Sequence, residues 1–212
     1  MKTKIAAFAA CCVLSAPLAA YAEFRVGGIV GSTSTSTNES NGSVFPASKT
    51  ENGTGFGIFG QWRTAANNTM DVGVHLGYSI DSAGDKQDIN VIRFSDSNIL
   101  PATIEVEIDS VIDLMGVVAW KGGSVRPFIM AGYSVIKFDA DLDVPADRFS
   151  ESDDDSAGGW KIAIGAEFPL ADSWSAHAMI DHANYGEIGL YEDDVEFDTV
   201  QTGIRFGVSY AF

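Results

Sequence analysis

The stretch Val200-Gln-Thr-Gly-Ile-Arg-Phe-Gly-Val-Ser-Tyr-Ala-Phe212 places apolar or aromatic residues at alternate positions. Because side chains alternate across a β-strand, one face is apolar and the other carries small or polar residues. A segment of about ten residues with these two faces is typical of a transmembrane barrel strand. The apolar face comprises Val200, Ile204, Phe206, Val208, Tyr210 and Phe212, and the opposite face Gln201, Gly203, Arg205, Gly207 and Ser209.

Residues 1–22 have the pattern of a cleaved secretory signal peptide. Two lysines precede an apolar run over 5–16, and Ala20-Tyr21-Ala22 supplies the small residues of a cleavage site. The apolar run is shorter than the roughly 20 residues that a membrane-spanning helix requires. We therefore expect a signal peptide over 1–22 and a single barrel domain over 23–212.

Both cysteines, Cys11 and Cys12, lie inside this segment, so the mature chain has neither a disulfide nor a thiol nucleophile. A lipidated start at Cys11 is the alternative to cleavage.

Removal of the signal takes away two lysines and no acid, which changes the formal net charge from −16 to −18. This charge excludes nucleic acid as a partner, because phosphate binding needs clustered Lys and Arg, and it is compatible with cations or basic proteins.

No apolar run of about 18 residues follows the signal, so membrane insertion requires a closed barrel. The clearest strand is 69–80, in which Met70 and Val72 alternate with Asp71 and His75. Both faces of 126–139 carry apolar residues, and its orientation stays unassigned. The expected fold is all-β, an eight-stranded antiparallel up-and-down barrel with strands over 24–33, 53–63, 69–80, 104–120, 126–139, 159–170, 174–185 and 200–212.

The connections alternate in length, which predicts the orientation of the barrel. Short turns occur at 64–68, 121–125 and 171–173, whereas the connections 34–52, 81–103, 140–158 and 186–195 are long. Outer-membrane barrels have short periplasmic turns and longer extracellular loops, so both termini are expected in the periplasm. The segment 32–43, rich in Ser, Thr, Asn and Gly, is predicted to be a mobile loop. Aromatic residues expected near the periplasmic rim are Trp62, Trp120, Phe168, Trp174, Tyr210 and Phe212.

A soluble eight-stranded barrel of the lipocalin type would have the reverse faces, with aliphatic residues inside around a ligand. The inner face predicted here carries glycines, acids and occasional Lys or Arg, which do not fill the core of a small soluble barrel. The sequence therefore favours an outer-membrane barrel.

Three motifs carry a family resemblance: Arg126-Pro127-Phe128 with Ala131-Gly132-Tyr133, Gly165-Ala-Glu-Phe-Pro-Leu170, and Thr202-Gly-Ile-Arg-Phe206 continuing to Phe212. They resemble the OmpA/OmpX-like eight-stranded outer-membrane barrels, and more specifically the porin-family, opacity-type surface proteins. The resemblance implies contact with outer-membrane lipid and lipopolysaccharide in a Gram-negative cell. It also implies that Tyr210 and Phe212 form the signal read by the barrel-assembly machinery.

Charged residues on inner faces predict an ionic network inside the barrel, since buried charges persist only when they are paired. Eight strands enclose an interior that side chains just fill, so an open pore is not expected. Arg205 and Lys161 are expected to contact carboxylates across the lumen. The predicted network contains Arg25, Asp71, His75, Asp113, Lys161, Glu167, His177, Asp181 and Arg205, with Arg63, Glu105, Glu107 and Asp109 also facing inward.

The segment Asp181-His-Ala-Asn184 is the sharpest enzymatic candidate. Lipid A deacylases on the same barrel carry His-x-Ser-Asn there, with the histidine activating the serine. This chain lacks the serine, and alternation points His182 towards lipid, so acyl transfer has no evident nucleophile. We expect no enzyme activity, no catalytic residue and no cofactor.

Acidic residues in the long connections offer a second hypothesis, because carboxylates at the cell surface attract hard divalent cations. Such cations would bridge the protein to lipopolysaccharide phosphates, while a merely solvated acidic surface is the alternative. The expected function is a non-enzymatic barrel for envelope integrity or contact with surface or host proteins. A narrow channel for small solutes or ions is the alternative, and a lipid A-modifying enzyme the third. Candidate cation ligands are Asp139, Asp141, Asp143, Asp153, Asp154 and Asp155.

Overall fold

A computed structural model describes residues 22–41, 49–92, 99–145, 149–190 and 195–212. The predicted signal peptide lies outside these residues except for Ala22, as do the tips of the long connections. The described part of the chain contains no helix long and apolar enough to cross a membrane. Its elements are β1 (Ala22–Asn41), β2 (Lys49–Ala65), β3 (Met70–Asp81), β4 (Gly84–Ile92), β5 (Ile99–Trp120), β6 (Arg126–Val144), β7 (Phe149–Pro169), β8 (Trp174–Leu190) and β9 (Val195–Ala211).

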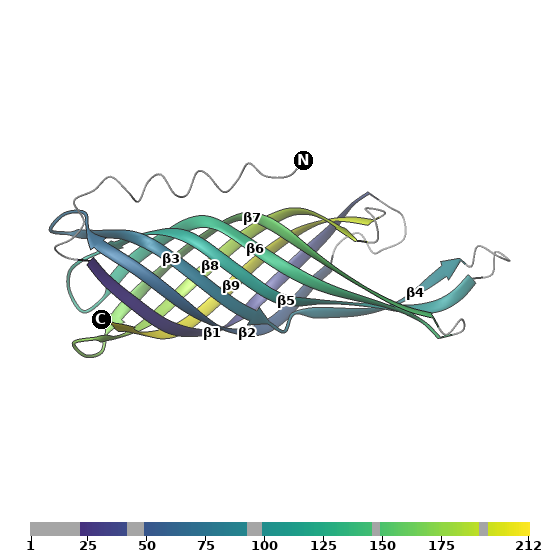
Figure 1. Ribbon diagram of the computed structural model, residues 1–212, viewed down its shortest axis with the longest axis horizontal. Coiled ribbons are helices and arrows are strands. Elements are labelled where there is room, and N and C mark those ends of the chain that lie inside the picture. The colour runs from purple at the N-terminus through teal and green to yellow at the C-terminus, as the bar shows by residue number, and fades with distance from the viewer. Residues whose placement is uncertain (1–21, 42–48, 93–98, 146–148, 191–194) are drawn as a thin grey trace.

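The strands form one closed antiparallel barrel (Figure 1). Consecutive strands pair with each other from β1 to β3 and from β4 to β9, whereas β3 and β4 do not pair, and β1 also pairs with β9 from Arg25↔Ala211 onwards. Strands β3 and β4 occupy a single position, because both pair with β5, β3 at Met70↔Trp120 and β4 at Gly84↔Glu107. The nine segments therefore make eight positions around the wall, and the predicted eight-stranded barrel is confirmed.

The strands extend well beyond their predicted limits. The predicted mobile loop at 32–43 is wrong over its described part, since β1 continues to Asn41 and pairs there with both β2 and β9. Thr33 and Thr35 are buried in the barrel interior. A Ser/Thr-rich segment forms a strand here because the two neighbouring strands satisfy its backbone groups and its side chains face water or the polar lumen.

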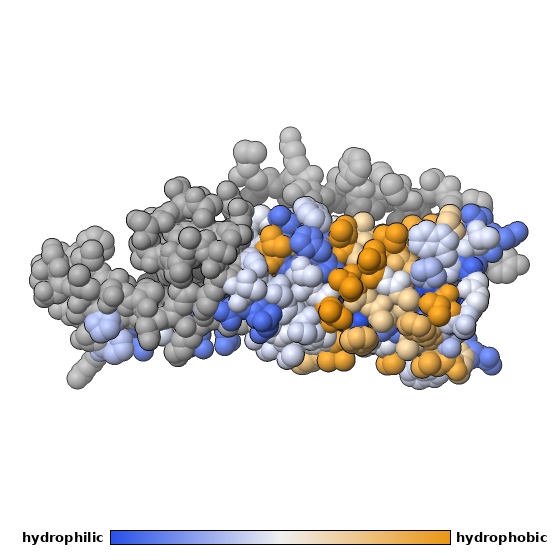
Figure 2. Space-filling model, turned by 180° about the vertical axis from the view of Figure 1, so that it is seen from behind, coloured by the Kyte–Doolittle hydropathy of each residue, from blue (hydrophilic) through white to orange (hydrophobic). Residues whose placement is uncertain are grey.

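Exposed apolar side chains form a belt on β1, β2, β3 and β5 to β9, and on the face seen in Figure 2 more hydrophilic surface lies on either side of it. On β7 it runs from Trp160 to Phe168 on alternate exposed residues. About nine tilted residues is the length that a transmembrane strand needs. The belt also settles the faces of 126–139: Ile129 and Tyr133 point outward, whereas Phe128 and Met130 are buried inside.

The two ends of the barrel differ. One end, here called the short-turn end, holds the C-terminus, the start of β1 and the turns 66–69, 121–125 and 170–173. The other, the hairpin end, carries the projecting parts of β4 to β7 (Figure 1). Aromatic rings meet at the short-turn end, where Tyr210 lies 5.2 Å from Trp174 and 5.0 Å from Phe212 between ring centroids. These rings form part of the predicted interfacial girdle.

A β-bulge at Asp109 makes the predicted inner and outer faces of β5 wrong on the N-terminal side of the bulge. The register of β5 against β6 shifts between Ile108 and Ser110, and both Ser110 and Val111 are buried. Because a bulge inserts one residue, the alternation inverts beyond it. Ile108 therefore faces the interior, while Glu107 and Asp109 are exposed on the outside instead of facing inward as predicted.

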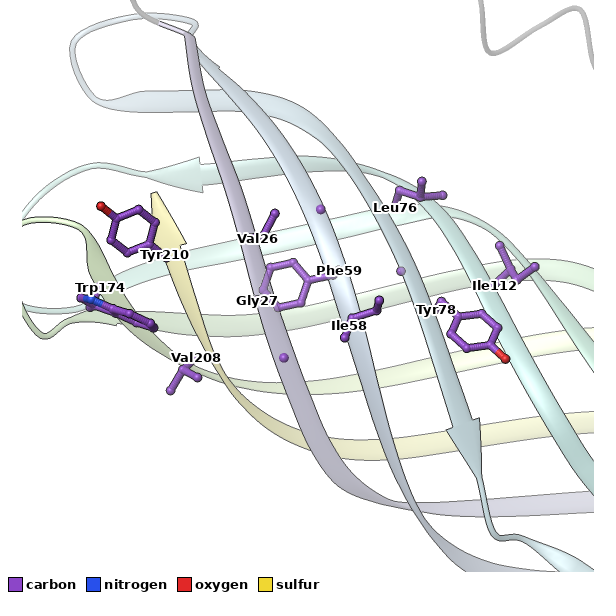
Figure 3. A pocket seen from close by; sticks show the side chains of 13 residues that line it. Val26, Gly27, Ile58, Phe59, Leu76, Tyr78, Ile112, Trp174, Val208 and Tyr210 are labelled. Atoms are coloured by element: carbon purple, nitrogen blue, oxygen red, sulfur yellow. The ribbon is translucent and has the colours of Figure 1, made fainter. Parts of the chain in front are cut away.

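A shallow apolar groove crosses the outer wall over β1, β2 and β3, and Figure 3 shows Val26, Ile58 and Leu76 along it. Gly28 and Gly60 belong to its lining, and a missing side chain at each leaves the wall hollow. Its lining is apolar and faces outward, so lipid chains are its natural contact. Phe59 lies on the inner face of β2, where its ring packs against Gly27 of β1 (Figure 3).

Alanine substitutions at the adjacent glycines Gly27 and Gly28 test this packing. A Cβ at Gly27 would lie 2.5 Å from both Phe59 Cζ and the Val208 carbonyl oxygen, whereas at Gly28 the nearest atom is the Gly57 carbonyl oxygen at 3.7 Å. Gly27→Ala should lower the free energy of unfolding by about 1–3 kcal/mol through overpacking. Gly28→Ala should be tolerated. Urea unfolding of the refolded protein in micelles measures both, and equal losses would contradict the assigned faces.

Candidate functional site

The interior of the barrel is filled by two groups of charged side chains with an aromatic layer between them. The Glu167 cluster consists of Glu23, Arg25, Arg63, Arg126 and Glu167. The Asp181 cluster consists of Asp113, Lys161, Asp181 and Arg205. All of these residues occupy inward-facing positions of their strands, which is why residues distant in sequence converge.

The Glu167 cluster joins opposite sides of the wall near the short-turn end. The Glu167 carboxylate is 0% exposed, and its two oxygens lie 2.6 Å from Arg25 Nη1 and 2.7 Å from Arg63 Nη1. Arg126 Nη1 is 3.6 Å away, and the Ser175 hydroxyl donates to Glu167 Oε1 at 3.1 Å. Arg25 also contacts Glu23. A buried carboxylate with several cationic donors is well compensated for its loss of solvent.

The Asp181 cluster lies farther along the barrel and is balanced in charge. Lys161 Nζ is 3.0 Å from Asp113 Oδ2 and 3.4 Å from Asp181 Oδ1. Arg205 Nε donates to Asp181 Oδ2 at 2.8 Å. The Ser134 hydroxyl donates to Asp113 Oδ1 at 2.6 Å. These contacts link β5, β6, β7, β8 and β9 across the lumen.

Neutral polar groups continue this network. Tyr185 contacts Ser134 at 3.2 Å and donates to Gln201 Oε1 at 3.4 Å. Gln201 in turn donates to Asp81 at 3.4 Å, and the Thr33 hydroxyl donates to the same carboxylate at 2.6 Å. The buried hydrogen bonds therefore join the Asp181 cluster to the break between β3 and β4, where Asp81 also accepts the Ala83 N–H.

The two inward histidines belong to an aromatic layer between the clusters. The His75 ring stacks on Phe59 with 5.2 Å between centroids, and the His177 ring meets Phe59 edge-on at 5.7 Å. His177 Nε2 also lies 2.6 Å from Ser209 Oγ. Phe128 contacts His177 from the opposite side at 6.3 Å. The histidines therefore pack against rings and a hydroxyl.

An apolar cluster lies against the Asp181 cluster through Tyr185. It combines residues that sequence reasoning did not place inside, including Ile108 beyond the bulge. Its aliphatic and phenyl members on β5 and β6 are Ile108, Val111, Ile136 and Phe138. Apart from the Tyr185 hydroxyl, which contacts Ser134 and Gln201, the side chains of this cluster offer no hydrogen-bonding groups to water.

Some predicted network residues lie elsewhere. Asp71 is at the rim of the short-turn end, where it pairs with Lys121 at 2.8 Å and contacts neither cluster. Conversely, the sequence did not single out Arg126, Glu23 or Tyr185. Arg126 begins β6, and the uncertain faces of that strand concealed its inward direction.

The acidic candidates lie on strands and not in loops. Asp139, Asp141 and Asp143 are exposed on β6, and Asp154 is exposed opposite Asp139 on β7. Asp155 is opposite the buried Phe138 and accepts the Ser156 N–H, while the side chain of Asp153 is outside those described. Among the described residues, no three acids, histidines or cysteines form a group suited to a metal ion.

His182 faces outward, as alternation predicts. Its Nδ1 lies 3.0 Å from the Thr202 hydroxyl on β9, and its ring contacts Trp160 at 5.5 Å between centroids. A histidine next to a hydroxyl has the arrangement of a general base and a nucleophile. Enzymes that use such a pair also have a third group that orients the base. Within the described contacts, no carboxylate meets His182.

An apolar outer belt, a closed ladder of backbone hydrogen bonds and a charged, filled lumen together define a transmembrane β-barrel of the bacterial outer membrane. Residues 5–212 match the model of the outer membrane protein beta-barrel domain, and the chain belongs to that family. The membership confirms the predicted fold and location. No curated protein matches the chain.

The chain is similar to several solved structures, and two of them, with TM-scores of 0.50 and 0.53, support the fold. Neisserial surface protein A is 10% identical with a TM-score of 0.50, over 90% of this chain and 97% of that one. The outer membrane protease OmpT from Escherichia coli is 8% identical with a TM-score of 0.53, over 90% and 97%. Ail of Yersinia pestis is 14% identical with a TM-score of 0.47, over 91% and 100%. At such identities the likeness concerns the fold alone.

Asp181→Asn tests the energetic role of the second cluster. The change leaves Arg205 and Lys161 buried with one carboxylate fewer, and breaking a buried pair costs about 3–5 kcal/mol of unfolding free energy. Asp154→Asn is the matched control, because Asp154 is exposed and its one ion pair among the described residues is with Lys137, at 3.7 Å. This change should alter the free energy of unfolding by less than about 1 kcal/mol. Urea titrations in micelles measure both. Similar losses would refute the buried network.

Proposed function

We propose that this protein is a non-enzymatic outer-membrane barrel with a closed lumen, which acts in envelope integrity or surface contact through its hairpin end. The observation that carries the proposal is the ion pairing across the interior. Glu167 on β7 is held by Arg63 on β2, from the far side of the barrel. With the aromatic layer and the apolar cluster behind it, this pairing supports a barrel without a continuous pore.

The orientation follows from the two ends. Short turns and both chain ends suit the periplasm, and projecting hairpins suit the cell surface. The aromatic rings around Tyr210 then lie at the periplasmic interface, where such girdles form. We propose Tyr210 and Phe212 as the recognition signal for the barrel-assembly machinery, which is supported by the exposed Phe212 directly after β9 and by its ring contact with the half-buried Tyr210.

The outer face of the hairpin end is acidic and suits a cationic contact. Glu107 is directly opposite Asp139, which is directly opposite Asp154, and Lys137 lies within 3.8 Å and 3.7 Å of the two aspartates. Like charges opposite each other in adjacent strands repel. Divalent cations bridging to lipopolysaccharide phosphates, or a basic surface of a host protein, would relieve that repulsion.

The absence of enzyme activity is part of this proposal. The hydroxyl next to His182 belongs to Thr202 on β9. Among the described contacts, no carboxylate orients the His182 ring. Acyl transfer needs a nucleophile, a base and a group that orients the base. A narrow channel is the alternative function, which the polar side chains of the lumen favour.

Conductance separates the closed barrel from the channel. The purified protein inserted into planar bilayers should show no sustained unitary current steps, because charged pairs and rings cross the lumen at successive levels. The control is the same preparation shown to be folded by heat-modifiable gel mobility. Regular steps that disappear on heat unfolding would replace the closed-barrel proposal with the channel.

Binding to lipopolysaccharide tests the surface contact. The protein in micelles should bind lipopolysaccharide more tightly with Ca²⁺ than with a chelator, and the triple variant Asp139→Asn, Asp141→Asn, Asp143→Asn should lose most of that difference. The matched comparison is between the double variant Asp139→Asn, Asp141→Asn and the control Asp71→Asn, Asp172→Asn, which removes the same number of acids at the short-turn end. If the double variant and the control respond alike to Ca²⁺, the acidic hairpin face is not the contact.

A further inference from the structure

The Glu167 cluster holds an excess of positive charge. Three arginines, Arg25, Arg63 and Arg126, face two acids, Glu23 and Glu167. The other cluster is balanced, with Asp113 and Asp181 against Lys161 and Arg205. The surplus guanidinium group is Arg126, whose side chain is 41% exposed at the rim, whereas Arg25 and Arg63 are buried. The surplus positive charge therefore lies where an anion from solution can reach it.

Two guanidinium donors in this cluster are unused. Arg63 Nε and Arg126 Nε are buried without a hydrogen-bond partner among the described residues; Arg25 Nη1 also lacks one by geometry, but it lies 2.6 Å from Glu167 Oε1 in an ion pair. Glu167 does not meet these two nitrogens: Oε1 contacts Arg25 Nη1, Arg126 Nη1 and the Ser175 hydroxyl, and Oε2 contacts Arg63 through Nη1. Buried donors normally have partners, so these two mark a place for an acceptor that the chain does not supply.

The cluster is open to water on one side. The side chains of Arg126 and Glu23 are 41% and 40% exposed at the short-turn end, while Arg25 and Arg63 behind them are 5% and 4% exposed. Arg126 is therefore the guanidinium group of this cluster that water reaches, whereas Arg25 and Arg63 are shielded from it. The opposite direction is blocked by the layer of Phe59, Phe128 and the two histidines.

We propose that the Glu167 cluster is a binding site for a small oxyanion, a phosphate or carboxylate group that enters from the short-turn end. Guanidinium groups are planar forks that match these anions, and buried geometry strengthens each charge-assisted hydrogen bond. The bound anion accepts from Arg126 and Arg63 and neutralises the excess positive charge. A soluble anion and the head group of an anionic phospholipid share this chemistry.

The test is titration of inorganic phosphate into the protein in phosphatidylcholine nanodiscs, followed by calorimetry and by the arginine Nε–H NMR signals. The wild type should bind saturably, with shifts at Arg63 and Arg126. Arg126→Gln should weaken binding about tenfold or more, the loss of one charge-assisted hydrogen bond. Lys121→Gln is the matched control: it removes the same charge at the same end, but from a residue already paired with Asp71 at 2.8 Å.

A second variant should strengthen phosphate binding, a result that misfolding would not produce. Glu23→Gln increases the excess charge without removing a donor, so phosphate should bind more tightly, while heat-modifiable mobility stays unchanged. Absence of saturable binding in the wild type, with phosphate and with lipid, would overturn the proposal. Equal weakening by Arg126→Gln and Lys121→Gln would do the same, since it would indicate a diffuse charge effect.

Nanodiscs with phosphatidylglycerol distinguish the two sources of the anion. If a lipid head group occupies the site, these discs shift the Arg63 and Arg126 signals without added phosphate, and they reduce phosphate binding. If a soluble anion is the ligand, the signals shift only on addition of phosphate, in both lipids. Both results support the site, and the same Lys121→Gln control applies to each.

Discussion

Backbone hydrogen bonding in lipid is the constraint on which this structure depends. A strand in the bilayer has no water for its N–H and C=O groups, so each strand needs a partner on both sides. The ladder meets this need by pairing β1 with β9 and by pairing β5 with β3 and then with β4. Closure then fixes one face of every strand to the lipid and the other to a narrow lumen.

Alternation made that division predictable from sequence wherever the two faces differ in chemistry. The segment 69–80 is such a case, because Val72 and Leu76 oppose Asp71 and His75. The segment 126–139 is not, since both faces are apolar and only the neighbouring strands decide that Phe128 faces inward. The bulge at Asp109 had no composition signal, and a single inserted residue reversed the direction of Glu107.

The lumen network was predictable as a set of residues and not as a set of contacts. Alternation places Arg63 and Glu167 on inner faces, but their 2.7 Å contact depends on the stagger and diameter of the barrel. The same holds for Asp71, which is on an inner face at a height where Lys121 reaches it and the two charged clusters do not. Height along the barrel is a property of the closed sheet, which a single strand does not encode.

Charge is distributed unequally along the barrel axis, and this has a functional consequence. The hairpin end presents exposed carboxylates such as Asp139 and Asp141, while the short-turn end holds the surplus guanidinium group at Arg126. The balanced Asp181 cluster and the rings on Phe59 separate them, so neither end compensates the other. In a barrel with the closed lumen proposed above, each end would attract ions of the opposite sign from its own compartment, since fields in low-dielectric surroundings are weakly screened. The two proposed binding surfaces would then be independent of each other.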